Sequence, residues 1–578
     1  MVRRGRHRQY LEERPVRKPP VWRLLIFPLV LLVMVWFVYN LSNIAQQQTE
    51  AQHFLFTRSH LPLDSQQQYD VNLYDLSLRF SFPRDSARPY VRGKTKIVFT
   101  SRKTILKELQ LDFNSTLRID SIGGNLYRYQ WKDGVITIAL RHPLVHGKQD
   151  SLVVYYSGYP QPYHPWVKGM AFTWRRRSDY AAVPWVNTMN PPFGAQTWFP
   201  CKDVPWDKAD SAVVRISVPD TLVGVSNGKL VATDSANGWR TYIWKTRYPI
   251  APYLIAVNVG DYREYRFDYT SISGKTFPVV FYYFNEDVEV LQEVEHQVRR
   301  MFRFFEHRLG PYPFPDEKYG MVLYNNGGGM ENQTISSVQT FSPQRERLFA
   351  HELSHQWVGD WVTNADFHQS FLNEGLATYL TALYWRDVNG DSAFNAYMER
   401  LRVKEAGPLW IEHILVPDSV YSTSRVYFKG AWFFRMLHEM VGDSVFWTAL
   451  RNYLTRHAFQ TVTYTDLLNA FPQSARVSDF FQSWVFNTGV PRVTLRWKKK
   501  AENGRFARYT VEVRQENDDP FVFLLPVTFY TATETVEKDF WITGKKQSFQ
   551  VDFTQPVDSL QVQARARVLL NLLALQKQ

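Results

Sequence analysis

The stretch RERLFAHELSHQWVGDW, residues 345–361, contains the pattern H-E-x-x-H at His351, Glu352 and His355. On a helix, two residues four positions apart differ by about 40° around the axis, so both imidazoles face one point. Such a pair can bind one zinc ion, while Glu352 is free to act as a general base toward a metal-bound water. The pattern therefore predicts a helix that carries the active site of a zinc hydrolase.

The third metal ligand is expected at Glu374, which opens a second helical run, EGLATYLTALYWRD. Eighteen residues separate it from His355, enough for a loop that packs the second helix against the first. Two histidines and one glutamate leave a fourth position open for water, as in catalytic zinc sites, so we expect one Zn²⁺ per chain. The alternative is a pair of histidines on an ordinary surface helix with an acid nearby.

Outward from this motif, the hydrophobic pattern divides the chain into three folded parts. Residues 69–265 alternate with period two, which predicts a β domain of antiparallel strands. Helical spacing begins near Asp287 and dominates to about Phe486, and strand patterns return from Val493. The sequence thus predicts an α+β multidomain protein: an N-terminal β-sandwich or saddle domain, a mainly α catalytic domain at 266–490, and a small C-terminal β-sandwich at 491–570.

Composition excludes several other classes of protein. Of the 578 residues, 45% are hydrophobic and 21% are charged, which is typical of globular chains. Cys201 is the single cysteine, so an intrachain disulfide framework is impossible. The net charge is +13, but residues 1–23 hold eight cations and two anions and contribute +6 of it. The remaining chain has no basic run that would indicate nucleic acid.

Residues 24–39 read LLIFPLVLLVMVWFVY and carry no charge. The run is short for a bilayer span, which needs about 20 apolar residues, but aromatic residues lie near its ends. We expect a transmembrane signal anchor, with the basic arm 1–23 in the cytoplasm, a polar tether at 40–68 and the catalytic domain outside the cytoplasmic membrane. A cleaved signal peptide and a buried core helix are the alternatives.

Together with the zinc motif, two further motifs resemble those of the M1 family of zinc aminopeptidases, within the gluzincins, over most of residues 70–570. One is Gly328-Gly329-Met330-Glu331-Asn332, nineteen residues before His351, which matches the family's G-x-M-E-N signature. The resemblance implies that Glu331 binds the free α-amine of a peptide and that the adjoining backbone aligns it like an added strand. It also implies a thermolysin-like catalytic domain. Read alone, the loop could be a glycine-rich turn.

The other motif is Tyr427-Phe428-Lys429-Gly430, which resembles the family's Y-x-K-G. The resemblance implies that the tyrosine donates a hydrogen bond to the oxyanion of the tetrahedral intermediate. Tyr421 is a nearby rival, but it lacks the following Lys-Gly. The segments Trp198–Asp203 and Val225–Gly228 resemble framework stretches of the family's first domain, which makes Cys201 a packed thiol rather than a nucleophile.

Two departures from the family pattern affect the expected site. Many members have a Glu or Gln in the first domain that assists amine binding, and that position falls near Pro191 here. Asn190 is the closest amide and is the candidate to replace it. The resemblance further indicates that the large C-terminal helical domain of many members is absent, which would leave a more open site.

The sequence therefore predicts a zinc-dependent aminopeptidase. Its expected partners are peptides with a free N-terminus and, through residues 24–39, a membrane. An endopeptidase of the same zinc clan, an additional epoxide hydrolase activity and a catalytically inactive peptide-binding module are the alternatives. The last is disfavoured because all of His351, Glu352, His355 and Glu374 are present.

Overall fold

The computed structural model describes the folded body of the chain and little of what precedes it. The described residues are Met34, Trp36, 63–83, 88–113, 115–161, 169–177, Asp179, 181–414, 417–502, 506–562 and 567–578. Apart from Met34 and Trp36, the expected arm, membrane span and most of the tether lie outside these residues. Over the part of the chain that is described, no helix combines the length and the apolar character needed to cross a membrane.

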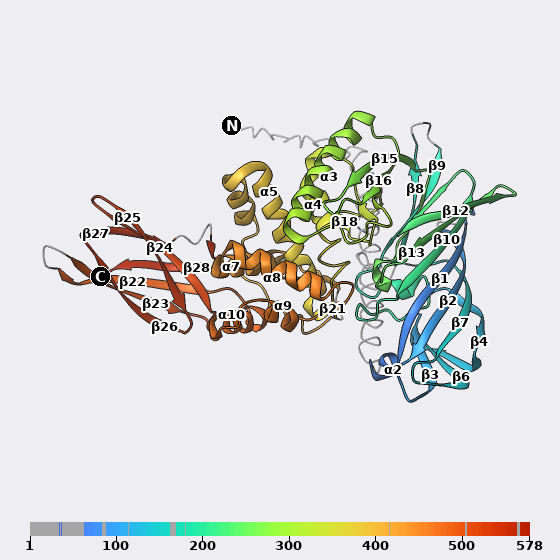
Figure 1. Ribbon diagram of the computed structural model, residues 1–578, viewed down its shortest axis with the longest axis horizontal. Coiled ribbons are helices and arrows are strands. Elements are labelled where there is room, and N and C mark those ends of the chain that lie inside the picture. The colour runs from blue at the N-terminus through green and yellow to red at the C-terminus, as the bar shows by residue number, and fades with distance from the viewer. Residues whose placement is uncertain are drawn as a thin grey trace, which may run out of the picture. The chain divides into compact units, whose positions relative to one another are not determined.

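The N-terminal β domain contains three sheets, drawn in blue to green in Figure 1. The largest has the order β12 (Lys229–Ala236), β13 (Trp239–Thr246), β10 (Ser211–Pro219), β1 (Tyr69–Ser81), β2 (Tyr90–Ser101), β7 (Gln149–Gly158), β4 (Arg118–Gly124). The second has the order β11 (Val223–Ser226), β14 (Val257–Gly260), β9 (Ala182–Met189), β8 (Gly169–Arg176). The third has the order β3 (Ile105–Asp112), β6 (Val135–Val145), β5 (Leu126–Lys132). A short helix, α2 (Leu63–Gln67), precedes β1.

Period-two burial explains the strands of this domain. In β1, Leu76, Leu78 and Phe80 are buried, whereas Ser77 and Arg79 between them are partly or fully exposed. The expectation of purely antiparallel strands is wrong at one place, because β1 pairs in parallel with β10. The whole run of chain from β2 to β9 connects these two strands, and a connection of that length allows a parallel pairing.

The catalytic region combines a mixed sheet with helices. Its sheet has the order β15 (Arg263–Thr270), β16 (Thr276–Tyr283), β17 (Tyr319–Leu323), β19 (Ser336–Val338), β18 (Gly329–Met330), so β18 forms one edge. The boundary expected at residue 265 falls inside β15, which pairs with β16 of this sheet. A two-stranded pair joins β20 (Thr363–Asn364) to β21 (Thr461–Val462).

The helices of this region run from green through yellow to orange in Figure 1. They are α3 (Val288–Leu309), α4 (Glu346–Ser354), α5 (Phe371–Arg400), α6 (Pro417–Val420), α7 (Gly430–Val441), α8 (Asp443–Arg456), α9 (Tyr464–Ala470) and α10 (Ala475–Phe486). Between α6 and α7, η5 (Thr423–Lys429) is a π-helix. α5 is interrupted at Gly390, where φ is 79° and ψ is 179°.

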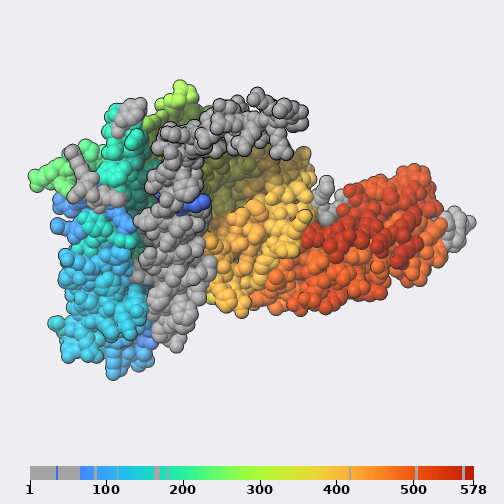
Figure 2. Space-filling model, turned by 180° about the vertical axis from the view of Figure 1, so that it is seen from behind, coloured from blue at the N-terminus to red at the C-terminus, as the bar shows by residue number. Residues whose placement is uncertain are grey.

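The C-terminal domain is a sandwich of two sheets. One has the order β26 (Lys546–Phe553), β23 (Ala507–Gln515), β22 (Arg492–Glu502), β28 (Asn571–Lys577), and the other β25 (Thr535–Ile542), β24 (Phe523–Thr531), β27 (Val557–Val562). β28 extends the domain beyond residue 570 and pairs in parallel with β22. Figure 2 shows the red surface of this domain continuous with the orange surface of α7–α10. The succession of a β domain, a mainly helical region and a second β domain confirms the expected fold class.

Candidate active site

The two histidines and Glu374 converge where α4 meets α5. Glu374 Oε2 lies 3.3 Å from His351 Nε2 and 3.3 Å from His355 Nε2, and the two nitrogens are 3.1 Å apart. Tetrahedral bonds of about 2.0–2.1 Å from zinc to its ligands place neighbouring ligand atoms roughly 3.3 Å apart. The donor types and their spacing therefore fit zinc, with His351, His355 and Glu374 as the residues that would hold it.

The helix predicted over residues 345–361 is shorter than expected, because α4 ends at Ser354. The chain turns back through Gly359, which has φ of 142°, and Asp360 donates its N–H to the carbonyl of His355 at 2.9 Å. His355 Nδ1 lies 2.9 Å from the carbonyl of Val358 in the same turn. That contact places the ring proton on Nδ1 and leaves Nε2 with a lone pair for a metal.

Glu352 follows His351 on α4 and is only 4% exposed. Its carboxylate lies against Gly329, where a Cβ atom would overlap Glu352 Oε1. Burial raises the pKa of Glu352 well above its usual value, and Glu331 and Glu374 add to the rise while His355 opposes it. A carboxylate with a raised pKa beside a metal site is suited to accept and return a proton.

The loop that carries Glu331 depends on Gly328 and Gly329. Gly328 has φ of 78°, a left-handed conformation that favours glycine, and it pairs with Gln339 through its N–H and its carbonyl at 2.8 and 3.1 Å. Gly329 provides the room for Glu352 and, with Met330, forms the edge strand β18. Asn332 is buried and donates to the hydroxyl of Ser337 at 3.1 Å. The loop thus presents backbone at a sheet edge beside Glu352.

Glu331 is 5% exposed and forms no ion pair within the described chain. Burial raises its pKa to about 7, with His355 opposing and Glu374 adding to the rise. A buried carboxylate without a cationic partner is costly when it is charged, and a ligand cation would remove that cost.

A turn of the N-terminal domain holds this loop from outside. The side-chain amide of Asn227 donates to the carbonyls of Gln333 and Leu254 at 2.7 and 2.9 Å. The N–H of Gly228 donates to Thr334 Oγ1 at 2.8 Å. The turn predicted only as a framework match therefore sets the position of the Glu331 loop.

Tyr427 lies on η5, with its ring 6.1 Å from the His351 ring at an interplanar angle of 30°. Burial raises the pKa of its phenol well above the usual value, and Glu374 adds to the rise. The hydroxyl therefore stays protonated near neutral pH and remains a hydrogen-bond donor. Tyr421, the rival, is also near the site. Burial raises the pKa of its phenol, and the nearby charges of Glu331 and Glu374 add to the rise.

Asn190, proposed from the sequence as an amine ligand, is not available for that role. It is fully buried, and its amide nitrogen donates to the carbonyls of Tyr253 and Ile255, both at 3.0 Å. Its oxygen accepts the indole N–H of Trp198 at 2.9 Å. The expectation is wrong because both polar atoms of this amide already form hydrogen bonds within the N-terminal domain.

Tyr253 is a residue of the site that sequence reasoning missed. It is 2% exposed, its ring packs on Phe367 at 5.8 Å, and its hydroxyl has no hydrogen-bond partner within the described residues. Burial raises its pKa, with Glu331 as the largest charged contributor. No local pattern marks it, because it lies in another domain, far from Glu331 in the sequence.

Comparison with known proteins agrees with this arrangement. The Peptidase M1 N-terminal domain model matches residues 70–254, and the Peptidase family M1 domain model matches residues 293–484. The chain belongs to peptidase family M1. The resemblance on which the zinc, amine and tyrosine roles were expected is thereby confirmed at the level of the family.

Individual relatives within family M1 are distant in sequence. Aminopeptidase N of Escherichia coli is 27% identical over 318 residues, which cover 50% of this chain and 36% of that protein. Aminopeptidase M1-B of Oryza sativa is 24% identical over 390 residues, covering 62% of this chain and 43% of that protein. The chain thus spans less than half the length of these curated relatives.

A solved structure resembles a larger share of the chain. It is a mutant M1 zinc metallopeptidase of Deinococcus radiodurans bound to a Tyr-Ser-Ala substrate. The match has a TM-score of 0.63 and 27% identity, and it covers 74% of this chain and 96% of that one. Zinc is accordingly the metal that both the family and the donor geometry indicate.

Proposed function

We propose that the protein is a zinc-dependent aminopeptidase that hydrolyses the N-terminal bond of peptides. The observation that carries this proposal is the buried carboxylate of Glu331, which forms no ion pair with any residue that the structure describes. It lies one residue from an edge strand that touches Glu352. An endopeptidase needs the zinc ligands and Glu352, but it has no use for a buried anion at this place. A free α-ammonium is the group that would pair with it.

The geometry suggests how a peptide would bind. Its ammonium pairs with Glu331 while its backbone extends the sheet along the free edge of β18, as in β-strand addition. Pairing at one end fixes the scissile bond one residue further along. This placement restricts cleavage to the first peptide bond.

Chemistry then requires a base and an oxyanion donor beside the metal. Bound zinc would supply a Lewis acid that makes water a nucleophile at neutral pH. Glu352 takes the proton of the attacking water and passes it to the leaving amine. Tyr427 donates a hydrogen bond to the substrate oxygen on which negative charge develops.

The Glu352→Gln variant tests the proposal, because the amide keeps the shape of the side chain but cannot accept the proton. Turnover of an aminoacyl substrate should fall by about 10²–10⁴-fold. Zinc content, measured by elemental analysis, should stay at one per chain. Near-native turnover in this variant would refute the assignment of Glu352 as the base.

We further propose that residues 24–39 anchor the chain in a membrane, with its N-terminus in the cytoplasm and the catalytic domain on the other side. The uncharged apolar run and the cations before it support this orientation. Carbonate extraction should leave the full-length chain in the membrane pellet and release a variant lacking residues 1–40 with equal specific activity. Release of both would contradict the anchor.

A further inference from the structure

The segment that carries Tyr427 has an unusual backbone conformation. It belongs to the π-helix η5, which passes directly into α7 at Gly430. π-Helical turns are rare and frequently occur at functional sites. The direction in which the Tyr427 hydroxyl points therefore depends on what fixes η5 from outside.

One end of η5 is fixed by a close helix crossing. A Cβ atom on Gly375 would lie 2.9 Å from Gly430 Cα, and one on Gly430 would lie 2.9 Å from Gly375 Cα. The backbones of α5 and α7 therefore touch at this point, immediately after the zinc ligand Glu374. A Cβ atom on Gly375 would also lie 3.1 Å from the carbonyl oxygen of Val426 in η5. The crossing therefore sets the depth of η5 on the side that faces α5.

Lys429, two residues after Tyr427, supplies a contact to a different part of the chain. It is fully buried, and its ammonium donates to the carbonyls of Gly407 and Asn487 at 3.0 and 2.9 Å. The ammonium also lies 5.5 Å from the ring centroid of Phe521 and 6.0 Å from that of Trp484. Two carbonyls and two aromatic faces thus hold the end of η5.

These partners are fastened to the C-terminal β domain. The indole of Trp484 donates to the carbonyl of Val522 at 2.8 Å, and the amide of Asn487 donates to the carbonyl of Pro520 at 3.2 Å. Lys429 therefore joins the Tyr427 segment to a domain that supplies none of the predicted site residues.

Stability alone does not explain a charged group at this position. Burial lowers the pKa of Lys429 to about 7, with Arg425 contributing to the decrease. Buried charges are often replaced by apolar residues with no loss of stability, and in some proteins they serve instead to fix one conformation.

We propose that Lys429 is a positioning residue for Tyr427, which holds η5 so that the phenol hydroxyl meets the substrate oxygen. The inference rests on the proposed aminopeptidase activity. It gives the C-terminal β domain a part in catalysis through a single buried ammonium.

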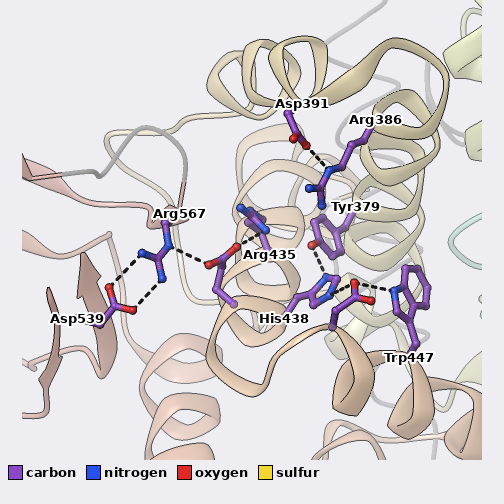
Figure 3. Close-up of polar contacts among 10 residues, drawn as sticks. Tyr379, Arg386, Asp391, Arg435, His438, Trp447, Asp539 and Arg567 are labelled. Carbon is purple, nitrogen blue, oxygen red and sulfur yellow. Dashed lines mark hydrogen bonds and ion pairs between the residues drawn. The ribbon is translucent and has the colours of Figure 1, made fainter. Parts of the chain in front are cut away.

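A matched control exists at the other end of α7 (Figure 3). Arg567 binds Glu439 of α7 at 2.9 Å and both oxygens of Asp539 in β25 at 3.1 and 2.9 Å. It joins the same two domains, but Glu439 is nine residues from Gly430, about 13 Å along the helix. Figure 3 also shows Tyr379 of α5 meeting His438 Nδ1 of α7 at 2.8 Å, which ties this end of α7 to α5 independently of Arg567.

A double-mutant cycle in the full-length zinc enzyme tests the proposal. The proteins compared are the native chain, Tyr427→Phe, Lys429→Met and the double variant. Lys429→Met should lower kcat by about 10–100-fold, with KM and zinc content near native, because a displacement of about 1 Å can cost 10²-fold. In the Tyr427→Phe background the same change should lower kcat less than about threefold. Arg567→Gln should leave kcat within about twofold in both backgrounds.

Each outcome separates the inference from the proposed function. Equal loss from Lys429→Met in both backgrounds would overturn the positioning role, even if the aminopeptidase activity stands. No loss of kcat in Tyr427→Phe would instead refute the proposed role of Tyr427. If Lys429→Met fails to fold, Lys429→Arg replaces it: a smaller loss of kcat that again disappears without the Tyr427 hydroxyl supports the inference, and additive losses overturn it.

Discussion

The metal-binding half of the site and the substrate-facing half are built in different ways. His351, His355 and Glu374 lie on or directly after two neighbouring helices, α4 and α5, and approach one another within 3.3 Å. Glu331 and Tyr427 instead lie on an edge-strand loop and a π-helix. Their segments are held by Asn227 of the N-terminal domain and by Lys429, which contacts the C-terminal domain.

This difference shows that metal binding and peptide alignment depend on different interactions. Local helix geometry aligns the two histidines, and the packing of α4 against α5 adds Glu374. Alignment of a peptide against the metal depends on contacts that reach in from both flanking domains. Changes to the metal-binding half should therefore abolish zinc binding. Changes around the substrate-facing half should alter the rate, affinity or specificity toward peptides while zinc stays bound.

The largest effect is expected from removing a metal ligand. Glu374→Ala leaves two imidazoles, and the loss of one of three protein ligands should remove both zinc and turnover. Elemental analysis and a kinetic assay check this together. A Glu374→Ala variant that retains stoichiometric zinc would show that this carboxylate is not a ligand.

Tyr427→Phe should affect the substrate-facing half of the site and leave the metal-binding half unchanged. Zinc content should stay native, while kcat falls by about 10²–10³-fold because one oxyanion donor is lost. Tyr421→Phe is the matched control, since Tyr421 is also half-buried near Glu331, and it should cost far less. A larger loss of kcat from Tyr421→Phe would reverse the assignment.

The amine anchor should show its own pH dependence. Burial raises the pKa of Glu331 to about 7, and only the ionised form, which predominates above that pH, can pair with an ammonium. An inhibitor with a free amine should therefore weaken by about fivefold between pH 7 and pH 6. Its des-amino analogue should not change, and the difference between the two should vanish in Glu331→Gln.

The smallest kinetic effect is expected from Asn227→Ala. This change leaves the carbonyls of Gln333 and Leu254 without their donor, so the free energy of unfolding should fall by about 2–4 kcal/mol. KM should rise a few-fold as the Glu331 loop loosens, with zinc content unchanged. A fall in kcat with unchanged KM would place Asn227 outside amine positioning.

The sequence predicted the metal half better than the substrate half, for a physical reason. The spacing of His351 and His355 is a property of one helical turn and is visible in five letters. The sequence did not reveal that α4 ends early, at Ser354, because this end depends on the backbone conformation of Gly359. The contacts of Tyr253, Asn190 and Lys429 join segments that are distant in the sequence, and no local pattern encodes such contacts.

The parallel pairing of β1 with β10 escaped prediction for the same reason. Alternation specifies which face of a strand is buried but not which strand lies beside it. The π-helix η5 was likewise invisible, although the Y-x-K-G resemblance identified Tyr427 and Lys429 within it.

The most direct test of the account is cleavage of one peptide in two forms, with a free and with an acetylated N-terminus, by the native protein and by Glu331→Ala. The native protein should release the first residue of the free peptide only, and Glu331→Ala should lose most of that preference while keeping its zinc. Equal cleavage of both forms by the native protein, or cleavage at an internal bond, would contradict the account.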